Sequence, residues 1–308
     1  MKIFVTGATG VVGRRAVPLL IAAGHRVTAV GRDAARRDAL ERAGAASVTV
    51  DLFDRDALRR AVDGHHVVVN LATHLPSSTT RMMLPGAFRE NDRLRRDGSA
   101  NLADAVLAAG VGRFVQESYA PIYEDGGTRL IDESAPVRPV KYNRTVLDAE
   151  HSAARVLAAG ADAVTLRFAN MYGHDGRYFH DALKMLRRGM APLPGPAHAY
   201  VSSISHDDAA SAVVAAVSVP AGVYNVCDDQ PLMRETYFAA MADAFGVPHP
   251  KPIPSWMVRL MGTSGELLSR SQRLTNRKLA AHGWAPRHPS VVSGFRAAAQ
   301  LLERAAAA

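Results

Sequence analysis

Short apolar runs alternate with amphipathic helical patterns along the first 170 residues of the chain. The helical patterns repeat apolar residues every three or four positions, and the runs between them are rich in valine. Runs covered by helices on both faces of a sheet read as continuously apolar. The alternation therefore predicts a doubly wound parallel sheet of the α/β class. The runs lie at 2–7, 26–30, 47–51, 65–72, 113–118 and 163–168, and the helical patterns at 12–24, 34–43, 54–64, 99–110 and 145–160.

The pattern changes after Phe168. Residues 171–198 hold glycine and proline clusters around one amphipathic segment, and residues 231–308 are helical patches broken by proline-rich stretches. A segment near 199–230 returns to the apolar pattern of the first part. We therefore expect a main α/β domain at 1–170, completed near 199–230, and a smaller lid formed by 171–198 and 231–308.

Composition narrows the function classes. The chain has 308 residues, of which 48% are hydrophobic and 21% charged, and its net charge is +8. The arginines are scattered rather than gathered in a basic run with aromatic residues, so we expect no nucleic-acid partner. No apolar stretch reaches the ~18 residues of a membrane-spanning helix, and the first residues lack the apolar core of a signal peptide. We expect a cytoplasmic monomer or homodimer without membrane contact.

Metal chemistry is not expected either. The single cysteine, Cys227, excludes an intrachain disulfide and a zinc site built on several thiolates. His65–His66 and His206–Asp208 look like ligands, but no His-x-x-x-His with a carboxylate partner occurs. Asp208 falls at the start of a predicted helix, where aspartate caps backbone amides.

The chain opens with a glycine-rich turn. The sequence VTGATGVVG sets Gly7, Gly10 and Gly13 directly after the first predicted strand and at the start of the first helix. The pyrophosphate of a dinucleotide must approach such a turn closely, facing the amides of the helix N-terminus. The strand–turn–helix context favours this interpretation over a plain tight turn. The expected phosphate contacts are Gly7, Thr9, Gly10, Val11, Val12 and Gly13.

The residues at the end of the second predicted strand indicate whether NADH or NADPH binds. NAD-selective sites place a carboxylate there, which accepts hydrogen bonds from the ribose 2′-hydroxyl. This chain has Gly31 followed by Arg32, with Arg36 four residues further on. Glycine leaves room for a 2′-phosphate, and a guanidinium binds phosphate through two hydrogen bonds. We therefore predict NADPH as the cofactor, with Arg32 and Arg36 as phosphate contacts; a solvated helix residue is the alternative for Arg36.

With its TGxxGxxG turn, its strand–helix ladder and its C-terminal lid, the chain resembles the extended short-chain dehydrogenase/reductases, which are NAD(P)-dependent epimerase/dehydratase-like proteins. The resemblance runs from Met1 to about residue 290. It implies that the domain at 1–170 is a Rossmann-type NADP-binding domain and that the lid at 171–198 and 231–308 binds the substrate. It implies adenine contacts at Asp51 and Leu52 and contacts near the cofactor ribose after the fourth strand. The further cofactor contacts expected are Leu71, Ala72, Thr73, Gln116 and Tyr142.

The catalytic residues depart from that family. Its members use a Ser or Thr hydroxyl and a Tyr-x-x-x-Lys motif. In FVQESYAPIY the hydroxyl position falls on Tyr119, preceded by Ser118, and in KYNRTVLDAE the tyrosine is Tyr142 but the lysine position is Val146. Arg95 stands where the family often has an asparagine. The candidate catalytic residues are therefore Tyr142, Ser118 and Tyr119, acting without the lysine.

The missing lysine favours reduction over oxidation. A free phenol has a pKa of about 10, so Tyr142 without a neighbouring lysine is a poor base for oxidising an alcohol. It remains a competent acid, because hydride addition to a ketone creates an alkoxide far more basic than a phenolate. We therefore predict an NADPH-dependent ketoreductase. The degraded motif resembles the atypical members of the family that reduce aromatic polyketides such as angucyclinones in antibiotic biosynthesis, which implies a bulky aromatic ketone as substrate.

Two other functions stay open. The first is that of a nucleotide-sugar epimerase or dehydratase, and the second is that of a catalytically weak NADP-binding sensor or regulator. Apolar residues of the lid and of one loop are either plain core or the wall of a pocket for a flat apolar substrate. They are Met82, Met83, Phe179, Met185, Met190, Trp256 and Met261.

Overall fold

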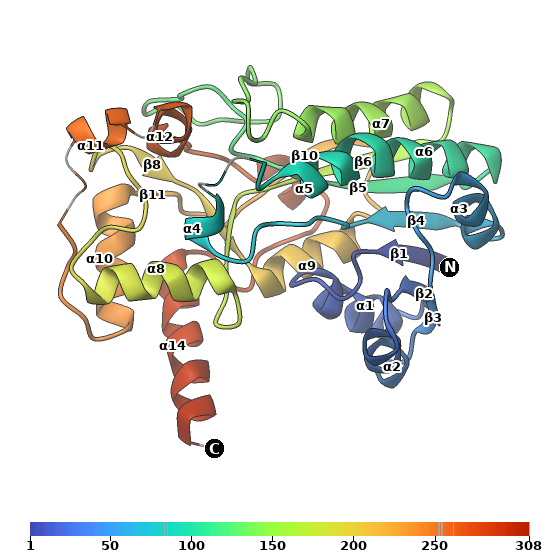
Figure 1. Ribbon diagram of the computed structural model, residues 1–308, viewed down its shortest axis with the longest axis horizontal. Helices are drawn as coiled ribbons and strands as arrows, with labels where there is room; N and C mark the ends of the chain where they lie inside the picture. Colours follow the sequence, from blue (N-terminus) through green and yellow to red (C-terminus); the bar gives the residue numbers. More distant parts are fainter. Residues whose placement is uncertain (83, 85, 252, 254, 261, 308) are drawn as a thin grey trace.

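A seven-stranded parallel sheet forms the centre of the protein (Figure 1). The computed structural model describes residues 1–308 except 83, 85, 252, 254, 261 and 308, so Met83 and Met261 lie outside the described residues. The strands are ordered β10-β6-β5-β4-β1-β2-β3, and the order reverses between β1 and β4. Such a reversal opens a crevice at the carboxyl ends of the strands. The strands are β1 Lys2–Thr6, β2 Arg26–Val30, β3 Ala46–Val48, β4 Val67–Asn70, β5 Arg113–Tyr119, β6 Asp162–Phe168 and β10 Gly222–Val226.

Helices cover both faces of this sheet, which confirms the predicted doubly wound fold (Figure 1). Helices α1, α2 and α9 enclose one apolar core, which contains Val5, Val17 and Val213. Helices α3, α6 and α7 enclose the other, which contains Phe4 and Phe114. The helices are α1 Gly13–Ala22, α2 Ala34–Arg42, α3 Arg55–Val62, α6 Ser99–Ala108, α7 Val146–Ala158 and α9 His206–Ala215.

Polar caps set where several helices begin. Asp33 accepts a hydrogen bond from the amide of Arg36 at the start of α2, and Asp54 does the same for Ala57 at α3. Each cap satisfies an amide that has no partner within its own helix. At α9 the cap is Ser205, while the Asp208 carboxylate accepts the amides of Arg287 and His288.

The C-terminal subdomain has an apolar core of its own, which includes Phe179, Tyr237, Phe238 and Phe295. It packs beside the carboxyl ends of the strands (Figure 1). The segment containing Leu274 and Trp284 packs instead into the core of the sheet, so the division of the chain at 231 stays a prediction. The remaining elements are α8 Arg177–Arg187, α10 Arg234–Ala244, α11 Ser255–Leu260, α12 Gly262–Ser269, α13 Arg277–Ala280, α14 Val291–Ala307, α4 Thr79–Met82, α5 Arg89–Arg93, β7 Asn170–Tyr172, β8 Tyr200–Val201, β9 Ser203–Ser205 and β11 Leu232–Met233.

Two local features differ from the sequence prediction. The third strand is Ala46–Val48 rather than 47–51, because this edge strand pairs with β2 alone and the side chain of Thr49 then bonds the Gly31 carbonyl. A π-helical turn, Leu94–Gly98, precedes α6. Turns of this kind are rare and concentrate at functional sites.

Among the described residues, no helix is both long enough and apolar enough to cross a lipid bilayer.

Candidate active site

The glycine turn lies between β1 and the loop that follows β4. Gly7 has a φ of +67°, and a Cβ atom there would lie 2.2 Å from the carbonyl oxygen of Leu71. A Cβ on Gly13 would lie 2.3 Å from the carbonyl oxygen of Gly7. The backbone therefore passes too close to its neighbours for any side chain, as a pyrophosphate-binding turn requires.

The start of α1 is left open to an anion. No side chain caps this helix at Val12, and its first turn contains no acidic residue. Thr9 and Val11 are partly buried beside it, while Gly10 is exposed and donates its amide to the Gly7 carbonyl. Uncapped amides at a helix N-terminus attract phosphate through their hydrogen bonds and the helix dipole. This arrangement fits the dinucleotide predicted from the sequence.

Three arginines surround the end of β2. Arg32 is exposed, and Arg36 pairs with Asp33 at 3.3 Å on the exposed side of α2. Arg37 was missed by the sequence prediction, yet its Cγ is 2.7 Å from where a Cβ of Gly31 would lie. It donates to the Thr49 hydroxyl at 2.8 Å. The small residue at position 31 therefore packs against the stem of Arg37 and is followed by the exposed Arg32, and guanidinium groups near this position would suit a 2′-phosphate.

The other predicted cofactor contacts follow the carboxyl edge of the sheet. Asp51 is exposed and Leu52 is buried, while Leu71, Ala72 and Thr73 run from buried to exposed after β4. Gln116 differs from them, since its amide is held inside the sheet. It accepts from Asn70 at 2.9 Å and donates to the Glu117 carbonyl at 2.8 Å, so it braces the strand ends.

Tyr119 and Tyr142 meet at the end of β5. Their phenols lie close enough to affect each other's pKa, and the Tyr119 hydroxyl donates to Asn170 Oδ1 at 3.4 Å. Burial raises the pKa of both phenols, and the contact with Tyr119 raises that of Tyr142 further, against the opposing charge of Arg95. Both side chains are therefore neutral at pH 7. The Phe88 ring packs on Tyr142 at 5.1 Å between centroids.

Ser118 and Val146 lie apart from the two phenols. The Ser118 hydroxyl donates to Glu150 on α7, and that carboxylate also binds Arg167 through two nitrogens. Val146 is fully buried at the first position of α7, and Tyr142 stands in the turn before the helix. No cation therefore reaches Tyr142 from the position that carries the family's lysine.

A buried ion pair lies beside the phenols. Arg95, in the π-helical turn, donates to Glu117 Oε1 at 3.2 Å, and both side chains are almost fully buried. Arg95 Nε and Glu117 Oε2 have no partner within the described part of the chain. The sequence prediction did not identify Glu117 as the ion-pair partner of Arg95, because nothing in a strand sequence shows that an arginine from another element will reach it.

A small pocket opens next to Tyr119, between the sheet and the C-terminal subdomain. Its walls include Tyr119 and Asn170 on one side and Arg234, Arg270 and Gln272 on the other. The described apolar residues expected to line a substrate pocket do not line it. Phe179 belongs to the core of the subdomain, and Met190 and Trp256 are exposed. The pocket wall combines its polar side chains with apolar ones, among them Leu193, Val201 and Leu267.

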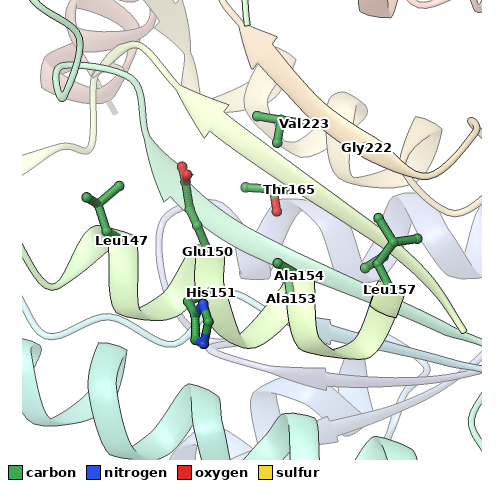
Figure 2. A pocket seen from close by; sticks show the side chains of 10 residues that line it. Leu147, Glu150, His151, Ala153, Ala154, Leu157, Thr165, Gly222 and Val223 are labelled. Atoms are coloured by element: carbon green, nitrogen blue, oxygen red, sulfur yellow. The ribbon is translucent and has the colours of Figure 1, made fainter. Parts of the chain in front are cut away.

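A second hollow lies beside α7 and the strands β6 and β10 (Figure 2). Figure 2 shows Leu147, Glu150, His151 and Leu157 projecting from α7 around it. It contains neither phenol, and the one carboxylate on its wall, that of Glu150, is already paired with Arg167. It is therefore not the place where the tyrosines would act.

Comparisons with known proteins agree with this geometry. The model of the NAD dependent epimerase/dehydratase family matches residues 3–227. The chain is 34% identical to a 3-diazoavenalumate denitrifying reductase of a Streptomyces species, over 96% of this chain and 99% of that protein. It is 25% identical to a 4-hydroxy-2-methyl-3-oxo-4-farnesyl-3,4-dihydroquinoline-1-oxide ketoreductase of Stigmatella aurantiaca, over 80% and 74%. The human epimerase family protein SDR39U1, solved with NADPH, has the same fold, with a TM-score of 0.78 at 22% identity over 97% and 99%.

Proposed function

Because the chain belongs to the NAD-dependent epimerase/dehydratase family, we propose that it is an NADPH-dependent reductase that passes hydride directly to a bulky aromatic ketone. The observation that carries the proposal is the pair of neutral phenols, Tyr119 and Tyr142, with Val146 in place of the family's lysine. Reductase-named relatives support the direction of the reaction. The guanidinium groups around Gly31 support NADPH over NADH.

Different groups of residues bind the coenzyme and supply the proton in the proposed reaction. The glycine turn and the start of α1 would hold the pyrophosphate, and Arg32, Arg36 and Arg37 would hold the 2′-phosphate. The bound coenzyme supplies the hydride. The Tyr142 hydroxyl gives its proton to the oxygen of the reduced ketone, because an alkoxide is far more basic than a phenolate. Tyr119 lies next to Tyr142 and is held in place by its hydrogen bond to Asn170 Oδ1.

The same phenols argue against a sugar epimerase or dehydratase. These reactions begin by oxidising a hydroxyl group, which needs a base at the tyrosine position. Burial raises the pKa of Tyr142 well above its usual value, so the phenolate is scarce at neutral pH. A sensor without turnover would bind NADPH equally well. It would, however, oxidise none of the coenzyme in the presence of an aromatic ketone.

A second acceptor is an aromatic diazonium group. The relative at 34% identity is named a denitrifying reductase of a diazo compound. Replacing a diazonium group by hydrogen consumes one hydride and releases dinitrogen, so NADPH becomes NADP⁺ and no proton is needed. A site without the Tyr–Lys pair can support this reaction, because no proton has to be supplied. NADPH oxidation measured in parallel with an aryl ketone and with the matching arenediazonium salt separates the two acceptors, and oxidation with neither contradicts the reductase proposal.

Replacing Tyr142 with phenylalanine tests the proton donor. We expect Tyr142→Phe to keep at least about a tenth of the ketone-reducing activity, because positioning for hydride transfer supplies most of the rate and a general acid adds about 10²-fold at the low end of its range. Water or Tyr119 replaces part of that contribution. Dinitrogen release from a diazonium substrate should not change at all. Complete loss of ketone reduction, with NADPH binding intact by fluorescence titration, would falsify the idea.

A further inference from the structure

One arginine on the wall of the Tyr119 pocket is buried without a counterion. Arg234 begins α10 and is only 4% exposed. Its Nη2 donates to the carbonyl oxygens of Leu268 at 3.1 Å and Arg270 at 3.4 Å. Nε and Nη1 have no hydrogen-bond partner, and no carboxylate pairs with this side chain, among the residues that the structure describes.

This arrangement is costly for a group with only a structural role. A buried charge whose donors are not all satisfied loses its hydration without full compensation. Burial lowers the pKa of Arg234 to about 10, so the side chain still carries its charge at neutral pH. The charge is thus kept inside the pocket wall, with two donors free.

Arg270, in the same wall, shows what a structural arginine looks like here. Its Nη2 binds the Glu266 carboxylate at 3.2 Å. Its Nη1 donates to the carbonyl oxygens of Tyr123 at 3.0 Å and Arg138 at 2.7 Å. Arg270 therefore has a carboxylate partner, which it shares with Arg138, whereas Arg234 has none among the described residues.

Other polar side chains line the same pocket as Arg234. Gln272 donates its amide to the carbonyl oxygens of Tyr123 and Glu124, which leaves its Oε1 atom without a partner within the described ranges. Tyr119 and Asn170 line the same pocket. A ligand in this pocket would therefore meet the Arg234 guanidinium from the subdomain and the Tyr119 phenol at the end of β5.

We propose that Arg234 binds a carboxylate group of the substrate, so that the reducible group lies toward Tyr119. The substrate class is then an aromatic carboxylate, which rests on the proposed function in that the pocket holds the substrate. A carboxylate matches the planar fork of a guanidinium with two parallel hydrogen bonds. It would also neutralise the charge that the protein leaves without a partner.

Binding to the NADP⁺-loaded protein tests the proposal without turnover. The probes are 4-acetylbenzoate and 4-acetylbenzamide, which have the same shape and differ in charge, and calorimetry measures both. The wild-type protein should bind the acid at least tenfold more tightly than the amide. Arg234→Gln should weaken acid binding roughly 100-fold, as expected for truncating one partner of a buried charge pair, and should leave amide binding unchanged.

Two further variants separate recognition from folding. Arg234→Lys keeps the charge but not the fork, so it should retain part of the preference for the acid. Arg277→Gln removes one positive charge from the exposed surface of α13 and should retain all of it. Circular dichroism and NADP⁺ binding show whether Arg234→Gln folds. If it does not fold, the preference of the wild-type protein for the acid over the amide, and the part of it that Arg234→Lys retains, test the carboxylate site instead.

The outcomes are distinct for the two proposals. Equal binding of acid and amide to the wild-type protein, no binding of the acid, or a full preference in a folded Arg234→Gln protein overturns the carboxylate site. Since NADP⁺ cannot reduce the probes, none of these results depends on catalysis. A protein that prefers the acid but never oxidises NADPH overturns the reductase function and leaves the carboxylate site standing.

Discussion

Replacing Gly31 with aspartate is expected to weaken NADPH binding roughly 100-fold, because like charges brought together at a binding site cost several kcal/mol. A side chain at position 31 would first displace Arg37, whose Cγ lies 2.7 Å from the new Cβ. It would then set a carboxylate against the 2′-phosphate. NADH has a 2′-hydroxyl instead, which donates to a carboxylate, so its affinity should rise and the coenzyme preference should reverse.

Fluorescence titrations with NADPH and NADH measure this change, and Ala39→Asp is the matched control. Ala39 is exposed on α2, further along the same helix, so the variant adds the same charge away from Gly31. It should shift both affinities less than about twofold, because an exposed charge is screened by solvent and salt. NADPH still preferred by Gly31→Asp would contradict the assignment of the 2′-phosphate to this position.

Gly7→Ala is expected to remove NADPH binding or to prevent folding. The new Cβ would lie 2.2 Å from the carbonyl oxygen of Leu71, a backbone atom that cannot move aside. The φ of +67° adds the strain of a left-handed residue, about 1–2 kcal/mol. Because the clash joins β1 to the loop after β4, relieving it opens the crevice at the switch point of the sheet.

Gly24→Ala separates strain from clash. Gly24 has a φ of +83°, but its Cβ would meet no atom within 4 Å. This variant should lower the free energy of unfolding by about 1–2 kcal/mol and leave the affinity for NADPH unchanged. Thermal unfolding and coenzyme titration of both variants give the comparison. Equal stability and equal NADPH affinity of Gly7→Ala and Gly24→Ala would show that the close approach of Gly7 to Leu71 is not needed for coenzyme binding.

The sheet could be predicted from the sequence because its signals are local. Alternating valine-rich runs and helical patterns recur within windows of about ten to twenty residues, and they place β1, β2, β4, β5 and β6 close to their observed bounds. The third strand was set too long, since the pattern cannot show which strand lies at an edge. The π-helical turn Leu94–Gly98 has no sequence signal that distinguishes it from the α-helix it joins.

The polar side of the candidate site could not be predicted in the same way. Arg95 and Glu117 are 22 positions apart, and Tyr119 and Asn170 are 51 apart. By residue type alone, Phe179 and Trp256 suggest an apolar lid over the substrate. In the structure Phe179 lies in the core of the subdomain and Trp256 is exposed. Residue type indicates what a side chain can do, but burial and partners depend on segments far away in the chain.

The sequence by itself determined the features whose physics is local. These are the glycine turn, where the backbone tolerates no Cβ, the absence of a carboxylate at Gly31, and the absence of a lysine at Val146. Only the tertiary structure decided that Arg37 packs against Gly31, that Tyr142 lies close to Tyr119, and that Arg234 is buried in the wall of the Tyr119 pocket with donors that lack a partner. Such contacts join different elements, and their energies depend on desolvation, which exists only once the chain has folded.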